Sequence, residues 1–594
     1  MSVTITFLPD NKTVTVMPGT PIAVAAGSAG LVLRAPCGGK GTCGKCRIRL
    51  VSGSIKGKPV DNGFYLACQS FAEKDAVIDV PEDSRYYSQK IMVRGLQRHI
   101  QVKPNIRKTH IELKPPSLKD QTCDADRITD SIAAKVPAAY IPTDILNSVP
   151  GIIRDTDYDV TVVTDQNKVI AVEPGDTHNE SYGVAVDIGT TTVAGMLLSI
   201  KSGSVLESVS RTNPQSEFGE DVISRIDYAD KHNGQKELQE KIIHCLNEII
   251  DELCKKSNIQ PNSIYEVTVC GNTIMTHLLL SVSPRHIAQA PYIPVFRKAT
   301  DTALSTIGLH GNPNGNLHTL PNIAGYVGGD IIAGIIATGL HESEKIRVMI
   351  DIGTNGEIVI GNKHRMLSCA TAAGPAFEGA RISRGMRGSP GAIDKVVIDK
   401  DVQVNVIDDQ KPMGICGSGL IDAVAEMLDA GVIDETGRIM EPEEYSGGLE
   451  RIRQRIVPGD AGFDFILYAD KKSEIRLTQK DIREIQLGKS AIRAGIEILI
   501  NEYGIQTSDV DEILLAGAFG NFIRRSKAKR MGLLPDIPTE KIIYVGNTAS
   551  EGAIRTLLAC GCRESAEVVS RKVEYVELSG RKDFQSRYVE HMMF

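Results

Sequence analysis

Two copies of one short pattern restrict the fold of this chain more than any other feature. An apolar run that ends in Asp-x-Gly-Thr occurs at residues 184–192 as VAVDIGTTT, and it returns at residues 348–357 as VMIDIGTNGE. Apolar and β-branched residues followed by glycine and hydroxyl residues are typical of a strand that ends in a tight turn. Helical patterns follow both copies, so we predict a duplicated α/β unit over residues 181–594.

The turns after these two strands are suited to phosphate binding. Backbone N–H groups in a tight turn can surround phosphate oxygens, and threonine hydroxyls add further donors. Asp187 and Asp351 end the two strands, where a carboxylate can hold a hydrated Mg²⁺ ion. The candidate nucleotide-binding residues of the two turns are Gly189, Thr190, Thr191, Gly353, Thr354, Asn355 and Gly356.

A third strand, in EILLAGAFG at residues 512–520, ends in small residues. Small residues let a flat purine ring approach the backbone, so Gly517, Ala518 and Gly520 are candidates for binding adenosine. The chain contains no G-x-x-x-x-G-K-[ST] sequence, which argues against a P-loop nucleotidase.

These motifs do not determine which residue polarises the attacking water or hydroxyl. Glu357, which ends the second turn, and Asp221, in NPQSEFGEDVISRI, are the two candidates. An ordinary strand-end or surface charge is the alternative for both. We therefore treat Asp187, Asp351, Glu357 and Asp221 together as the candidate catalytic residues.

Three cysteines lie close together near the N-terminus, in RAPCGGKGTCGKC. Cys37, Cys43 and Cys46 have the spacing C-x5-C-x2-C, and Cys68 follows in LACQ. A plant-type [2Fe–2S] cluster uses C-x4-C-x2-C and a distant fourth cysteine, so this spacing is one residue longer. Zinc is the alternative occupant, but zinc ribbons usually contain two C-x2-C pairs. We predict a [2Fe–2S] cluster with these four cysteines as ligands.

The chain divides into four segments before any family is considered. Alternating polar and apolar runs predict a small β-sheet domain at residues 1–84, and residues 111–180 look like a small α/β module. Residues 85–110 between them contain seven Lys or Arg residues and no acidic residue, which indicates a basic linker. The whole chain has a net charge of −7 and no apolar run of membrane-spanning length. We therefore expect a cytoplasmic protein that binds neither nucleic acid nor a membrane.

Both groups of motifs resemble known families. The cysteine loop and LACQ resemble ferredoxins of the adrenodoxin and putidaredoxin type, which implies a β-grasp domain. The three glycine-rich motifs resemble, in the same order, the phosphate-1, phosphate-2 and adenosine motifs of the superfamily that contains actin, heat-shock chaperone ATPases, and acetate and sugar kinases. That resemblance implies two ribonuclease-H-like lobes with ATP between them and Mg²⁺ near Asp187 and Asp351. Residues 270–280 and 545–553 resemble the helices that connect the lobes.

A ferredoxin domain followed by such an ATPase resembles the reductive activators of corrinoid proteins, which are cytosolic, ATP-dependent enzymes of anaerobic methyl transfer. The resemblance covers essentially the whole chain and includes CGNTIMTHLL, AAGPAFEGARI and GICGSGLIDAVAEM. It implies one-electron reduction of inactive Co(II) to Co(I) on a corrinoid protein of a methyltransferase system. An external low-potential donor would supply the electron, and a homodimer is compatible with this function. No cobalamin motif occurs in the chain, so the corrinoid belongs to the partner.

Two other classes of function remain open at this stage. A small-molecule kinase fused to a redox domain would transfer a phosphoryl group to a metabolite. An activator of another low-potential enzyme, such as a radical dehydratase, would also combine ATP with electron transfer. Those activators usually hold one [4Fe–4S] cluster between two subunits and lack a ferredoxin head, which argues against the second class.

Overall fold

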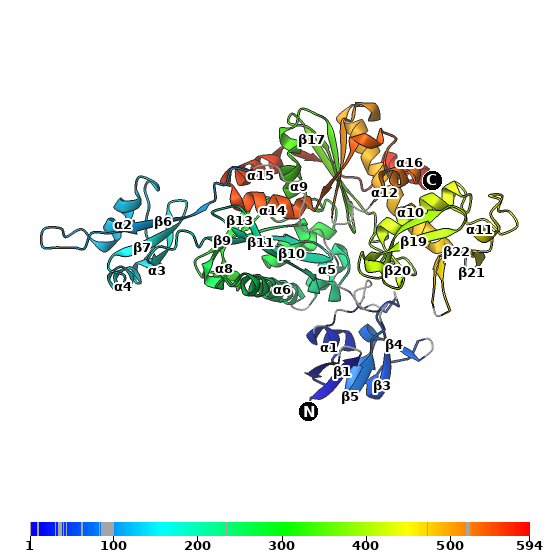
Figure 1. The fold of residues 1–594 in the computed structure, drawn as a ribbon, viewed down its shortest axis with the longest axis horizontal. Helices are drawn as coiled ribbons and strands as arrows, with labels where there is room; N and C mark the ends of the chain where they lie inside the picture. Colours follow the sequence, from blue (N-terminus) through cyan, green and yellow to red (C-terminus); the bar gives the residue numbers. More distant parts are fainter. Residues whose placement is uncertain are drawn as a thin grey trace.

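The computed structural model describes residues 2–594 with the exception of residues 9–10, 30, 32, 34–38, 40, 43, 61–62, 82–83, 85–99, 232–233, 472 and 518–522. Along the chain it contains an N-terminal domain, a middle module and a large block of two lobes (Figure 1). Among the described residues, no helix combines the length and the apolar composition that a bilayer crossing requires.

The N-terminal domain is a five-stranded mixed sheet with one helix. Its elements are β1 (Val3–Leu8), β2 (Lys12–Val16), α1 (Ile22–Ser28), β3 (Arg47–Lys56), β4 (Phe64–Leu66), the short 3-10 helix η1 (Ala67–Gln69) and β5 (Phe71–Asp79). The strand order is β2-β1-β5-β3-β4, with β1 and β5 parallel. Alternate residues of β1 are buried, and Ile5, Phe7, Ile48 and Ile78 form the core with Ile22 of α1. This arrangement confirms the expected β-grasp domain.

The middle module consists of a three-stranded antiparallel sheet and three helices. Its elements are β6 (Ile106–Glu112), α2 (Asp124–Ile132), α3 (Thr143–Leu146), α4 (Val149–Asp155), β7 (Asp159–Asp165) and β8 (Lys168–Pro174). Apolar residues of the helices and of the sheet share one core, including Ile128, Ile153 and Val162.

The sequence predicts that the basic linker ends at residue 110. In the structure β6 already begins at Ile106 and pairs with β7 along its length. Lys108, counted as a linker charge, is buried and donates to Glu173 on β8 at 2.5 Å. The basic composition of this segment concealed a strand whose charge is neutralised inside the module. Residues 85–99 of the expected linker lie outside the described residues.

Lobe I is built on a six-stranded sheet with the order β11-β10-β9-β12-β14-β13. Its strands are β9 (Tyr182–Ile188), β10 (Thr192–Ser199), β11 (Val205–Thr212), β12 (Ile264–Gly271), β13 (Thr300–Ala303) and β14 (Asn316–Thr319). Its helices are α5 (Val222–Ala229), α6 (Gly234–Ser257), α7 (Thr273–Leu279) and α8 (Leu304–Ile307). In α6, Leu238, Ile242, Ile249 and Leu253 recur at helical spacing and are buried in the core of the lobe.

Lobe II has the order β25-β24-β15-β16-β17-β26 and repeats five strands of this topology; its sixth strand, β26, pairs with β17, whereas β13 of lobe I pairs with β14. Its sheet contains β15 (Arg347–Ile352), β16 (Gly356–Gly361), β17 (Met366–Thr371), β24 (Glu512–Ala516), β25 (Ile542–Gly546) and β26 (Val573–Tyr575). In each lobe the first strand is antiparallel to the second and parallel to the fourth, as β9 is to β10 and β12 and as β15 is to β16 and β24. The predicted duplication is therefore confirmed at the level of strand order.

Two small sheets and several helices complete lobe II. They are β18 (Ala392–Ile398), β19 (Val402–Val406), β20 (Gly414–Ile415), α10 (Gly417–Asp429), α11 (Glu450–Arg453), β21 (Ile456–Gly459), β22 (Gly462–Ala469), β23 (Glu474–Leu477), α12 (Gln479–Tyr503), α13 (Arg525–Arg530), α15 (Cys560–Lys572) and α16 (Lys582–Glu590). The longest helix, α12, begins with a capping box between Thr478 and Asp481 and ends at Gly504, whose φ is +84°.

Two helices cross between the lobes, α9 (Gly329–Thr338) and α14 (Thr548–Leu558), and they share a core with both sheets. A Cβ on Gly552 of α14 would lie 2.2 Å from the carbonyl oxygen of Ala333 on α9, so glycine allows the close crossing. Of the two segments expected to connect the lobes, 545–553 holds this position. The other, 270–280, does not, because α7 packs inside the core of lobe I.

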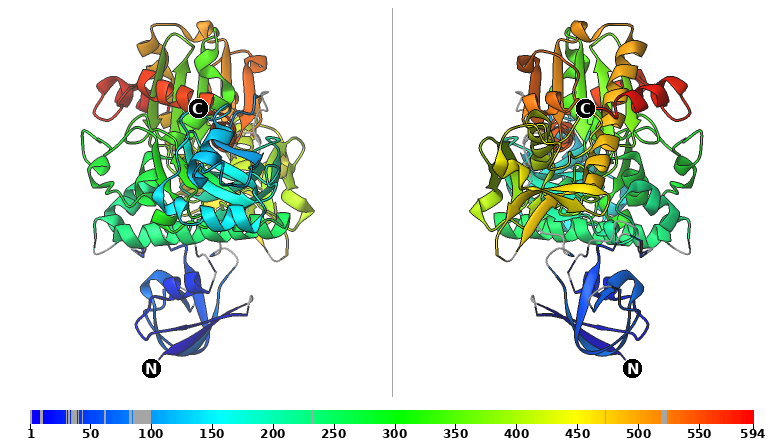
Figure 2. Two further views of the ribbon diagram at one scale, coloured as in Figure 1. Left: turned by 90° about the vertical axis from the view of Figure 1, so that its left-hand side faces the viewer. Right: turned by 90° about the vertical axis from the view of Figure 1, so that its right-hand side faces the viewer.

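The N-terminal domain and the middle module lie at separate places beside the two lobes (Figures 1 and 2). The middle module lies at one end of the molecule, and the N-terminal domain lies below the lobes. Helix α1 approaches lobe I at Glu217, and Lys45 donates from its Nζ to the carbonyl oxygen of Ile382 in lobe II at 3.2 Å. The N-terminal domain therefore contacts both lobes.

Candidate functional site

The ends of β9 and β15 bring together the two aspartates of the repeated motif. Asp187 pairs in register with Cys270 of β12, and Asp351 pairs with Ala516 of β24. Both side chains thus project at equivalent ends of the two central strands. Burial is the main cause that raises the pKa of Asp187 to about 6 and that of Asp351 to about 7, and the charge of Asp187 adds to the shift of Asp351.

A third aspartate, Asp330 in the first turn of α9, joins this pair. Burial raises its pKa to about 7, and repulsion from Asp351 and Asp187 contributes. Glu357 on β16 is 9% exposed, and its pKa is raised well above the ordinary range by burial and then by Asp330 and Asp351. The four carboxylates therefore repel one another, and a cation at this point would relieve the repulsion.

Helix α14 holds Asp187 in place from the other lobe. Asn547 donates from Nδ2 to Asp187 at 3.2 Å, and the Ser550 hydroxyl lies 3.5 Å from the same oxygen. Asn547 also caps α14 by accepting a hydrogen bond from Ser550 N. The sequence VGNTASEGA therefore connects lobe II to the carboxylate at the end of β9.

Both predicted phosphate-binding turns are tight. Gly189 N donates to Thr192 O at 2.9 Å, and Gly353 N donates to Asn355 O at 2.9 Å. A Cβ on Gly189 would lie 2.7 Å from Thr192 O, so only glycine fits there. Gly356 begins β16, where its carbonyl oxygen accepts a hydrogen bond from Thr371.

The segment NPQSEFGEDVISRI supports the first turn from the side. Asn213 donates to the carbonyl oxygen of Gly189 at 2.8 Å, and the buried Arg225 donates to the carbonyl oxygen of Thr190. Asp221 has a different position, because its carboxylate caps α5 by accepting from Ser224 N at 2.7 Å. The structure thus gives Asp221 a capping role and does not bring it into the carboxylate group.

The third motif reaches the same site through Gly517. Its φ is +92°, and a Cβ there would lie 2.7 Å from Asp351 Oδ1. Gly517 N also donates to Gly546 O, at the end of β25. Ala518 and Gly520, the other candidates for the adenosine side, lie outside the described residues.

Two carboxylates of the site were missed by the sequence analysis. Asp330 follows two glycines in VGGD, a pattern with no phosphate signature of its own. Glu378 lies in AAGPAFEGARI and accepts hydrogen bonds from Thr191 Oγ1 at 3.0 Å and from Thr354 Oγ1 at 2.7 Å. The glycines on both sides of Glu378 were the signal that could have marked this loop.

The cysteine loop brings two of the four predicted ligands together. Cys46 Sγ lies 3.3 Å from Cys68 Sγ, and this contact is the main cause that lowers the pKa of Cys46 to about 6. Gly41 and Gly44 have φ values of +74° and +66°, which the close curl of the loop requires. Cys37 and Cys43 lie outside the described residues.

The donor sets fit the two expected metal groups. Thiolates suit an iron–sulfur cluster, and Mg²⁺ needs only one or two carboxylates besides waters and phosphate oxygens. Within the described part of the chain, no group of three or more His, Cys, Asp or Glu side chains is arranged to hold a metal ion.

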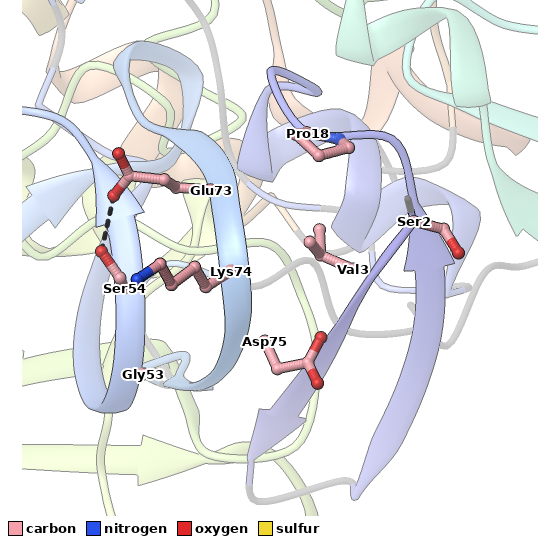
Figure 3. Close-up of a pocket in the computed structure, with 8 residues that line it drawn as sticks. All are labelled: Ser2, Val3, Pro18, Gly53, Ser54, Glu73, Lys74 and Asp75. Atoms are coloured by element: carbon pink, nitrogen blue, oxygen red, sulfur yellow. Dashed lines mark hydrogen bonds between the residues drawn. The ribbon is translucent and has the colours of Figure 1, made fainter.

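A separate shallow pocket lies on the N-terminal domain (Figure 3). It is lined by Ser2, Val3, Pro18, Gly53, Ser54, Glu73, Lys74 and Asp75. Three of its polar side chains have hydrogen-bond partners, since Ser54 donates to Glu73 at 2.6 Å and Asp75 accepts from Thr4 N at 2.7 Å. None of the candidate site residues lines this pocket.

Family models match four consecutive parts of the chain. Residues 5–73 match the 2Fe-2S iron-sulfur cluster binding domain, and residues 95–179 match the RACo linker region. Residues 182–343 match the RACo middle region, and residues 345–594 match the C-terminal domain of RACo, the ASKHA domain.

Individual proteins are similar over nearly the whole length. The corrinoid activation enzyme RamQ of Eubacterium limosum is 33% identical over 591 residues, which cover 96% of this chain and 95% of that protein. The [Co(II) methylated amine-specific corrinoid protein] reductase of Methanosarcina barkeri is 26% identical over 442 residues, covering 69% of this chain and 76% of that protein. A solved structure of a reductive activator for corrinoid,iron-sulfur protein superposes with a TM-score of 0.77 at 34% identity, covering 100% of this chain and 98% of the other.

Proposed function

Because the chain belongs to the family of reductive activators of corrinoid proteins, we propose that it uses ATP to return a corrinoid methyl carrier from Co(II) to Co(I). The observation that supports this proposal most directly is that one chain combines a thiol-bearing domain with an ATPase. A pair of converging thiols, Cys46 and Cys68, lies in a β-grasp domain that contacts a two-lobed ATPase. Neither a kinase nor a chaperone ATPase requires such a domain.

The nucleotide lies between the lobes in this proposal. The turns at residues 189–191 and 353–356 hold the phosphates, and Gly517 lies on the adenosine side. A magnesium ion near Asp187 and Asp351 would neutralise phosphate charge, and Asp330 would help to orient its water ligands. Asn547 keeps Asp187 in position, so the two lobes must be in contact for the site to be complete.

Electron delivery belongs to the N-terminal domain. A [2Fe–2S] cluster held by Cys37, Cys43, Cys46 and Cys68 supplies one-electron transfer when bound. In this proposal the transfer of an electron from the cluster to Co(II) is uphill. Each 100 mV of uphill transfer costs about 2.3 kcal/mol per electron, so a second source of free energy is required. ATP can provide this free energy only if ATP binds with different affinity to the Co(II) and Co(I) states of the complex with the corrinoid partner.

The same proposal includes the cellular compartment, the electron donor and the electron acceptor. Twelve cysteines in 594 residues are too few for a disulfide scaffold, which supports a reducing compartment such as the cytoplasm. An external low-potential donor would reduce the cluster, and the corrinoid protein of a methyltransferase system would receive the electron. A homodimer remains compatible with this scheme.

An absorbance assay tests the proposal. Co(II) corrinoid protein is mixed with the reduced protein, Mg²⁺ and ATP, and Co(I) is expected to accumulate only when all components are present. A panel of methyltransferase corrinoid proteins that stays in the Co(II) state under strong reductant and ATP would contradict the function. A phosphorylated metabolite in its place would favour the kinase alternative.

A further inference from the structure

Glu378 is the described carboxylate that contacts both phosphate-binding turns. One of its oxygens accepts from the hydroxyl of Thr191, which follows β9, and the other accepts from the hydroxyl of Thr354, which follows β15. These hydroxyls are also the side-chain donors that a bound phosphate would use. A terminal phosphate held by both turns must therefore compete with this carboxylate and lie beside it.

The turn that carries Glu378 is anchored in lobe II. The amides of Glu378 and Ala380 both donate to Pro375 O at 3.1 Å. Phe377, the preceding residue, is 1% exposed and packs against α12 at Gly488, where a Cβ would lie 3.1 Å from the ring. The backbone on either side thus fixes the direction of the carboxylate, as a reacting group requires.

The other carboxylates of the site have different surroundings. Asp187, Asp330, Asp351 and Glu357 lie close enough to repel one another, which suits the side of the site that faces a cation. Asp221 caps α5. Glu378 differs from all of these because both of its oxygens accept hydrogen bonds from the phosphate turns.

We propose that Glu378 is the catalytic carboxylate of ATP hydrolysis, an assignment that rests on the nucleotide site proposed above. Once phosphate oxygens take the hydroxyls of Thr191 and Thr354, the carboxylate has two free acceptor oxygens beside the γ-phosphate. It orients a water molecule and accepts one of its protons while the water oxygen bonds to phosphorus. The bond from phosphorus to the ADP oxygen breaks, ADP and inorganic phosphate leave, and Glu378 returns the proton to solvent.

The contacts of Glu378 with both turns also predict how this side chain affects ATP binding. Without nucleotide, Glu378 holds the two turns together through the two hydroxyls, and the triphosphate must displace it. Removing the charge of this side chain is therefore expected to leave ATP affinity unchanged or to raise it, because a neutral amide repels phosphate less than a carboxylate does.

The test compares Glu378→Gln with the wild-type protein in the full chain. We expect kcat for ATP hydrolysis to fall by about 100-fold or more, while the Kd for a fluorescent ATP analogue does not increase. Glu512→Gln is the matched control, since Glu512 pairs with Lys345 and Arg347 at the opposite end of β24. This control is expected to keep the wild-type kcat.

The outcomes separate this proposal from the proposed function. Wild-type protein that neither binds nor hydrolyses ATP would contradict the nucleotide site itself. Wild-type hydrolysis with a Glu378→Gln loss of kcat below about tenfold, or with a rise in KM alone, would overturn only the role of Glu378. If far-UV circular dichroism shows that Glu378→Gln does not fold, Glu378→Asp decides the question. A loss in kcat below about threefold in that variant would also overturn the assignment.

Discussion

At the scale of single residues, Gly517 shows how one backbone position shapes the proposed nucleotide site. Its φ of +92° is a conformation that L side chains rarely adopt, and the space where a Cβ would stand is taken by Asp351 Oδ1 at 2.7 Å. Gly504, at the end of α12, also has a positive φ of +84°, but no atom lies within 4 Å of its hypothetical Cβ. A comparison of substitutions at the two glycines therefore distinguishes the effect of backbone strain from the effect of displacing Asp351.

Replacing each glycine by alanine tests this difference. Gly504→Ala is expected to lower the free energy of unfolding by about 1 kcal/mol and to leave ATP hydrolysis unchanged. Gly517→Ala should in addition reduce kcat/KM for ATP by about 100-fold, because displacing a site group by about 1 Å has effects of that size. Steady-state hydrolysis and urea unfolding measure the two effects. Equal hydrolysis by both variants would contradict the placement of Gly517 beside the nucleotide.

At the scale of elements, β12 and α15 are joined by a buried ion pair. Glu266 lies on the fully buried β12, and the guanidinium of Arg563 on α15 forms an ion pair with it at 2.5 Å. Burial raises the pKa of Glu266 to about 7, although Arg563 opposes the shift. The folded state thus binds a proton more tightly than the unfolded chain, so this group makes stability fall as the pH rises from about 4.5 to 7.

Arg563→Met is expected to enlarge that pH dependence. Without the guanidinium, the Glu266 carboxylate is unpaired in the core, and the loss should reach about 3–5 kcal/mol at pH 8. At pH 5 the loss should be smaller, because folded Glu266 is then protonated. Urea unfolding followed by far-UV circular dichroism measures this, since the chain contains no tryptophan. The double variant Glu266→Gln/Arg563→Met should recover most of the stability at pH 8, and a loss independent of pH would contradict the argument.

At the scale of the whole molecule, the ligand loop and the ATPase belong to separate cores. Cys46 and Cys68 pack in the core of the N-terminal domain, whereas Asp187 and Asp351 lie in the two lobes. Residues 80–181 link the two parts along the chain, and Lys45 contacts Ile382 directly. Changes in the thiol ligands should therefore leave the nucleotide site folded.

Cys68→Ala separates the two activities. The variant is expected to lose iron, which should be about two atoms per wild-type chain, and to deliver no electron to a Co(II) partner. ATP hydrolysis and its stimulation by the partner should remain, because the coupling between two bound ligands is reciprocal and does not involve this thiol. Cys123→Ala, which changes an exposed cysteine of the middle module, is the control and should retain both activities. Loss of ATP hydrolysis in Cys68→Ala alone would show that the two parts depend on each other.

Much of the fold could be predicted from local patterns, because strand periodicity and turn residues act over a few neighbouring positions. The apolar runs that end at Asp187 and Asp351 predicted the duplicated lobes, and the cysteine spacing predicted the β-grasp domain through its resemblance to ferredoxins. Local composition was misleading where partners lie far away in the sequence. The basic charges of residues 107 and 108 suggested a linker, although β6 is stabilised by its pairing with β7 and by Glu173.

The sequence by itself determined where the two tight turns proposed to bind phosphate lie, because glycine at those positions follows from backbone geometry. Only the tertiary structure decided which carboxylates join them. Asp330 reaches the site because α9 crosses α14 closely at Gly552, and Glu378 reaches it because Phe377 is buried against α12. Asp221, which looked suitable in the sequence, is instead used to cap α5. Convergence of side chains from distant segments depends on helix crossing and core packing, which no short stretch of sequence contains.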